Sequence, residues 1–99
     1  MIEHIVLFRW KAEATAGQIE TAMASLRGLA GRIPGILGLT CGEDFSGRSK
    51  GYTHALVVRF ADRTALGAYG PHPAHREVFE RDIAPIRDET LGFDFQVRP

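Results

Sequence analysis

The pattern of apolar and polar positions predicts four strands. Residues 4–10 (HIVLFRW) are rich in β-branched and aromatic side chains and predict the first. In residues 51–60 (GYTHALVVRF), successive side chains fall alternately on the two faces of an extended chain, which predicts another strand. The same alternation over residues 91–97 predicts the last strand. Residues 36–45 have strand character weakened by glycines, and the polar residues 46–51 indicate a loop. Two of the strands are therefore joined by a hairpin-like connection.

Two helical regions separate these strands. A capping-box pattern, followed by apolar residues at steps of three and four, predicts a helix over residues 16–32 that ends before Pro34 and Gly35. Asp62 predicts the cap of a short helix, and a further helical run extends to about Pro85. The order is then βαββαβ, which is typical of an α+β, ferredoxin-like subunit. Such a subunit has a four-stranded antiparallel sheet with both crossover helices on one face.

The strands at residues 4–10 and 51–60 carry apolar side chains on both faces. The helices can cover only one of these faces. A second apolar face in a chain of 99 residues suggests that two copies pair sheet to sheet about a two-fold axis. We therefore expect a homodimer.

Composition narrows the classes of function. The length fits a single domain over residues 1–99. Twelve basic and twelve acidic residues give no net charge that would attract nucleic acid or an anionic membrane, so we expect neither as a partner. No apolar run approaches the roughly 20 residues that cross a bilayer. The chain starts with a strand pattern rather than a signal peptide, and the lone Cys41 has no disulfide partner, so we expect a cytoplasmic protein.

The stretch YGPHPAH at residues 69–75 concentrates groups suited to proton transfer. Imidazole, with a pKa of about 6.5, suits the removal of a proton beside a carbonyl, and a tyrosine hydroxyl can donate to the developing oxygen charge. Pro73 fits the first turn of a helix and would fix the direction of His75. His75 and Tyr69 are the candidate catalytic residues, whereas His72 fits a helix entry.

Two more histidines lie in predicted strands. His54 shares a strand face with Leu56, Val58 and Phe60, and His4 shares one with Val6, Phe8 and Trp10. If those faces are the covered ones, His4 and His54 would point toward His75 and help to line an apolar small-molecule cavity. The alternative is that His75, His4 and Tyr69 are structural, as a hydrogen-bonded residue, a polar strand end and a core aromatic residue. The spacing His72-x-x-His75 contains a proline and lacks a nearby acid, so we expect no metal site.

Five segments carry a resemblance to a known family. They are HIVLFRW at 4–10, IPGILGL at 33–39, FSGRSKGYTHALVVRF at 45–60, YGPHPAH at 69–75 and FDF at 93–95. Through these segments the chain resembles the Dabb family, the stress-responsive dimeric α/β barrel proteins, from end to end. The resemblance implies a homodimer in which two ferredoxin-like sheets face each other inside a dimeric α/β barrel.

The resemblance also implies a chemistry. Polyketide cyclases of this family close a linear poly-β-keto thioester by intramolecular aldol condensation without a metal or organic cofactor. Their general base and assisting tyrosine match His75 and Tyr69, and their two other pocket histidines match His4 and His54. Two functions remain open. The first is a cofactor-independent, polyketide cyclase-like enzyme, and the second is a non-catalytic protein that binds a hydrophobic small molecule or serves in a stress response.

Overall fold

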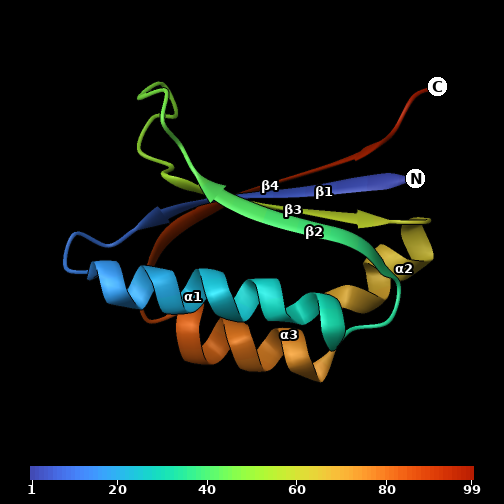
Figure 1. Ribbon diagram of the computed structural model, residues 1–99, viewed down its shortest axis with the longest axis horizontal. Coiled ribbons are helices and arrows are strands. Elements are labelled where there is room, and N and C mark those ends of the chain that lie inside the picture. The colour runs from blue at the N-terminus through green and yellow to red at the C-terminus, as the bar shows by residue number, and fades with distance from the viewer.

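In the computed structural model, which describes residues 1–99, one antiparallel sheet is covered by helices on a single face (Figure 1). The strands lie in the order β2-β3-β1-β4. Their bounds are β1 Ile2–Trp10, β2 Ile36–Glu43, β3 His54–Phe60 and β4 Arg87–Gln96. The predicted ferredoxin-like α+β fold is confirmed, with β1 and β3 at the centre of the sheet.

The helical segments are held by local capping. Their bounds are α1 Ala16–Gly28, the 3-10 turn Leu29–Gly31, α2 Arg63–Tyr69, α3 Pro73–Val78 and the π-helical turn Phe79–Ile83. Thr15 and Gln18 form the expected capping box before α1. Asp62 caps α2. None of these helices is long and apolar enough to cross a membrane.

Some boundaries differ from those predicted. The strand expected over 51–60 begins at His54, because Lys50 and Gly51 both have positive φ and turn the chain there. The helix expected over 16–32 ends as an α-helix at Gly28, and tighter 3-10 geometry continues it to Gly31.

The last strand is longer than its apolar alternation suggests. It begins at Arg87 rather than at residue 91, because its first residues pair with the end of β1 as far as Trp10. Backbone pairing with a central strand therefore extends β4 beyond the apolar residues that predicted it.

The hydrophobic core lies between the helices and one face of the sheet. From the sheet it takes the buried residues Ile2, Phe8, Leu56, Val58 and Phe60. These side chains pack with residues of α1 such as Ala22, Met23 and Leu26. The even-numbered positions of β1 and β3 therefore face the helices, and His4 and His54 both lie on the covered face, which was the condition for them to point toward the helices.

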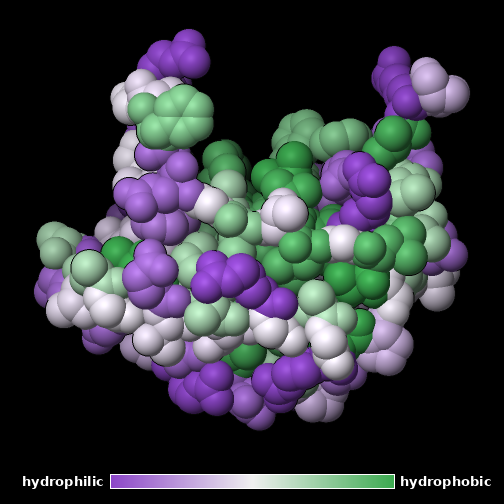
Figure 2. Space-filling view, in the orientation of Figure 1, coloured by the Kyte–Doolittle hydropathy of each residue, from purple (hydrophilic) through white to green (hydrophobic).

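The opposite face of the sheet is open and apolar. Leu91, Phe93 and Phe95 of β4 are exposed there, and Phe93 opposes Ile5 of β1. The loop between β2 and β3 and the C-terminal end of the chain rise above this face (Figure 1). Figure 2 shows hydrophobic surface in the hollow between these two projections. No element of the chain covers this face.

Candidate active site

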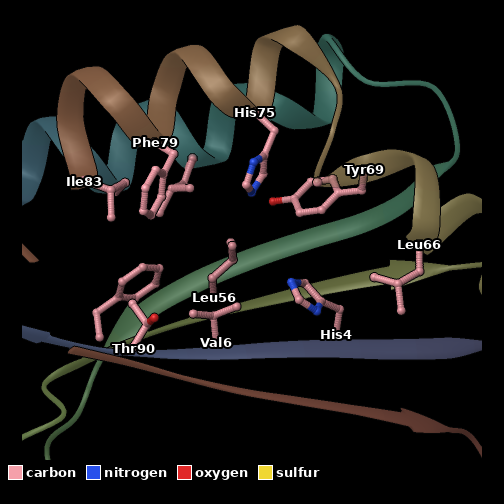
Figure 3. A pocket seen from close by; sticks show the side chains of 12 residues that line it. His4, Val6, Leu56, Leu66, Tyr69, His75, Phe79, Ile83 and Thr90 are labelled. Atoms are coloured by element: carbon pink, nitrogen blue, oxygen red, sulfur yellow. The ribbon is translucent and has the colours of Figure 1, made fainter.

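A cavity of about 310 Å³ lies between the sheet and the helices (Figure 3). His4, Val6 and Phe8 of β1 line it from the sheet, because residues two apart share a strand face. The other lining residues are Leu26, Leu56, Leu66, Tyr69, Gly70, His75, Phe79, Ile83 and Thr90. Most of these are apolar, as is usual for a small-molecule site with a few polar groups.

Tyr69 and His75 meet at one end of the cavity. Their ring centroids lie 4.7 Å apart in an edge-to-face arrangement, and the Tyr69 ring also contacts His4 at 5.6 Å (Figure 3). Tyr69 ends α2, and His75 lies in the first turn of α3 after Pro73. The structure therefore brings together three of the four side chains that the sequence placed in one pocket.

The surroundings shift the pKa values of His75 and Tyr69 in opposite directions. Burial lowers the pKa of His75, and positive charge on His4 lowers it further, while a backbone hydrogen bond with Gly70 acts in the other direction. His75 is therefore kept as a neutral imidazole that can accept a proton. Burial raises the pKa of Tyr69 to about 12, so that its hydroxyl stays protonated. No protein group hydrogen-bonds to this buried hydroxyl, so its donor proton has no partner within the protein.

His4 is oriented by a residue that sequence reasoning missed. Its Nδ1 hydrogen-bonds to Oδ1 of Asp94, which lies directly opposite it on β4. A carboxylate only accepts, so Nδ1 carries a proton toward Asp94 and Nε2 is the ring nitrogen that this contact leaves free. The sequence feature that could have indicated Asp94 is the FDF segment. Because Phe93 and Phe95 lie on the open face of the sheet, Asp94 between them lies on the face that the helices cover. The register that sets Asp94 opposite His4 could not be read from the sequence.

His54 does not reach this cavity, so its expected convergence with His75 is wrong. The cause is strand direction: His4 and His54 both lie near the starts of their strands, and antiparallel strands start at opposite ends of a sheet. His4 pairs with Val58 rather than with His54, four residues and about 13 Å away along β3.

The His54 side chain is instead part of a structural network. Trp10 donates its indole N–H to Nδ1 of His54 over 3.0 Å, and Thr53 Oγ1 lies 2.8 Å from the same nitrogen. Because an indole N–H is only a donor, Nδ1 must be the unprotonated nitrogen of His54. The buried imidazole thus joins the end of β1 to the start of β3.

His72 has the helix-entry role that the sequence predicted. It is the N-cap of α3, and its Nδ1 accepts a hydrogen bond from the backbone N–H of Ala74 over 3.0 Å. The pair His72 and His75 thus divides into one capping residue and one cavity residue. No three His, Cys, Asp or Glu side chains are grouped so as to hold a metal ion.

These groups together suit acid–base chemistry on a carbonyl compound. The site offers a neutral base on His75, a protonated donor on Tyr69 and an imidazole on His4 that is oriented by Asp94, all beside apolar walls. Comparison with known proteins adds the family. Residues 2–97 match the Stress responsive A/B Barrel Domain (Dabb) family. The chain belongs to the Dabb family.

Other Dabb proteins are similar at moderate identity. A stress-response A/B barrel domain-containing protein of Arabidopsis thaliana is 30% identical over 96 residues, covering 96% of this chain but only 36% of the plant protein. This Dabb chain therefore spans about a third of the length of that relative. Olivetolic acid cyclase of Cannabis sativa is 30% identical over 76 residues, which cover 75% of each chain.

A solved structure supports the same fold. The crystal structure of a dimeric ferredoxin-like protein of unknown function from Thermobifida fusca superposes with a TM-score of 0.85 and is 30% identical. The match covers 97% of this Dabb chain and 90% of that chain.

Proposed function

We propose that the protein is an acid–base enzyme that removes a proton beside a carbonyl group, with His75 as general base. The observation that carries the proposal is the contact of His75 with Tyr69 in an apolar cavity, where one ring is kept neutral and the other protonated. The likeness to olivetolic acid cyclase supports polyketide cyclase-like aldol condensation as the specific reaction.

The proposed step conserves atoms and charge. The neutral imidazole of His75 takes an α-proton, and the electron pair of the broken C–H bond forms an enolate whose oxygen accepts a hydrogen bond from Tyr69. In an aldol closure the enolate carbon attacks a second carbonyl of the same molecule, forming a C–C bond. The resulting alkoxide takes the proton back from the His75 imidazolium. His4, held by Asp94, hydrogen-bonds to a substrate oxygen through Nε2.

The test begins with proton exchange, which needs no knowledge of the natural product. Methyl ketones with alkyl tails of different lengths are incubated with the protein in D₂O, and loss of the α-proton NMR signal is followed. We expect His75→Gln to lower the exchange rate by about 10²- to 10⁴-fold, the usual contribution of a general base. Arg76→Gln, an exposed change on the same helix, is the matched control and should leave the rate unchanged.

The remaining outcomes separate the candidate functions. Exchange that is equal in wild type and His75→Gln would overturn the role of His75. Binding of ketones without exchange would favour the non-catalytic, ligand-binding alternative. A parallel screen of linear poly-β-keto thioesters tests the cyclase reaction itself, since exchange without cyclised product would leave a general-base enzyme of another kind.

We also propose that the functional unit is a homodimer formed through the open face of the sheet. The exposed apolar side chains of β4 support this, because exposed apolar surface of this kind marks an association site. The Thermobifida fusca relative is described as dimeric, which agrees with the proposal.

A further inference from the structure

A second polar group lines the cavity at the end away from His75. In Figure 3, Thr90 lies with Ile83 and Phe79 at one end, whereas His4 and Tyr69 lie at the other. Thr90 pairs with Phe8, and His4 pairs with Asp94, so the two ends are four residues apart along both β1 and β4. At 3.3 Å per residue this separation is about 13 Å along the strands.

The hydroxyl of Thr90 is held by an arginine. Arg87 donates to Thr90 Oγ1 from Nε over 3.2 Å and from Nη2 over 3.1 Å. The neighbouring carboxylates of Asp88 and Glu89 form salt bridges with Arg9 rather than with Arg87. The Thr90 oxygen therefore accepts from a cation, which polarises its O–H bond and makes it a stronger donor.

This arrangement determines which hydrogen bonds the Thr90 hydroxyl can still form. A hydroxyl has two acceptor sites and one donor proton. The two N–H groups of Arg87 take up the acceptor side, and no protein group accepts the Thr90 proton in a side-chain hydrogen bond. Thr90, which lines the cavity beside the apolar Ile83 and Phe79, thus has a donor proton without a protein side chain to accept it.

We propose that Thr90, positioned by Arg87, donates a hydrogen bond to a second oxygen of the ligand at the end of the cavity opposite His75. The site would then select linear carbonyl compounds with an oxygen acceptor near each end over compounds with a plain alkyl tail. A plain tail leaves the Thr90 donor unpaired when it displaces water, which costs affinity. The inference rests on the proposed function, because it takes this cavity to be the site that binds a ketone.

Titration of isotope-labelled protein with two matched ligand series tests the proposal by NMR. One series contains linear diketones with a keto group near each end, and the other contains methyl ketones of the same lengths. We expect the diketone to bind about three- to tenfold more tightly than the methyl ketone at one preferred length, which is the usual worth of one hydrogen bond. The preferred length reports the span between the two polar ends.

Variants show whether Thr90 causes the preference. Thr90→Val keeps the shape of the side chain but lacks the hydroxyl, so the affinity ratio of diketone to methyl ketone should fall to about one, and Thr90→Ser should retain most of it. Arg87→Met should reduce the ratio, because Arg87 positions and polarises the hydroxyl. Thr64→Val, the same change on the exposed surface of α2, should leave the ratio as in wild type.

The ratio compares two ligands on the same variant. A variant that is merely less stable should bind both ligands more weakly, so its ratio should not change. An unchanged ratio in Thr90→Val would overturn the proposal, as would equal binding of the two series to wild type at every length. Both results would leave the proposed role of His75 intact. If neither series shifts the resonances of the cavity residues, the proposed ketone site fails and this inference fails with it.

Discussion

The half-buried imidazole of His75 determines how the proposed reaction should depend on pH. Its pKa is lowered, chiefly by burial, so it gains a proton only at a pH below that of an ordinary histidine, about 6.5. We therefore expect kcat/KM to stay level around neutral pH and to fall on the acid side below about pH 6.5. A pH–rate profile of ketone exchange measures this. An acid limb above that pH would contradict the assignment of His75 as the neutral base.

The same shift links His75 to stability. A histidine whose folded-state pKa is depressed stabilises the fold above its unfolded-state pKa and loses this contribution as the pH falls through the folded-state pKa. We expect acid to lower the unfolding midpoint less in His75→Gln than in wild type over the range below about pH 6.5. Thermal melts across this range check the difference, and parallel curves for the two proteins would argue against a buried neutral His75.

The unpartnered hydroxyl of Tyr69 should matter to catalysis but not to folding. Tyr69→Phe removes no hydrogen bond within the protein and keeps the ring that packs on Phe60 and His75. We expect an unchanged or slightly higher melting temperature, because a buried unpaired polar group is itself costly. The exchange rate should fall about tenfold or more through loss of the donor to the enolate. A clear drop in melting temperature would reveal a structural partner for the hydroxyl.

At the scale of elements, α3 depends on an unusual cap. His72 accepts the N–H of Ala74 and starts the helix that carries His75. His72→Ala should therefore destabilise the protein by about 1 kcal/mol in denaturant unfolding, whereas His72→Asn, which can also cap, should lose less. Equal stability of the alanine variant and wild type would mean that Pro73 alone is enough to start the helix.

The sequence predicted which residues of a strand share a face, but neither which face is covered nor which strand ends meet. Alternation along β1 and β3 correctly grouped His4 and His54 with the apolar residues that the structure buries, since this grouping depends only on local periodicity. His54 was nevertheless misplaced, because its distance from His75 depends on strand direction and register. The pairing of His4 with Asp94 joins residues 90 positions apart and could not be inferred from either segment alone.

Tertiary packing also set details that local propensity leaves open. The π-helical turn Phe79–Ile83 continues α3 and places both of its end residues on the cavity wall. Such turns arise where packing rather than propensity decides the backbone, and they are frequent at functional sites. The sequence therefore indicated a helix here and gave no sign of its wider geometry.

At the scale of the whole molecule, the exposed aromatic residues of β4 should decide assembly. Phe93→Glu places a charge on the open face of the sheet, where Phe93 is 63% exposed. We expect wild type to sediment as a dimer at micromolar concentration and the variant to shift toward monomer, because a charge is costly to bury against a second apolar face. Ala24→Glu, on the exposed surface of α1, is the control. A monomeric wild type would contradict the proposed homodimer.

The open face between the β2–β3 loop and the C-terminal end also links the stability and assembly of this protein to its concentration. If two chains share that face, folding and pairing are coupled by mass action, and the melting temperature rises with protein concentration. Near the dissociation constant, doubling the number of chains more than doubles the number of pairs. A cell could therefore change the amount of assembled protein steeply through modest changes in expression.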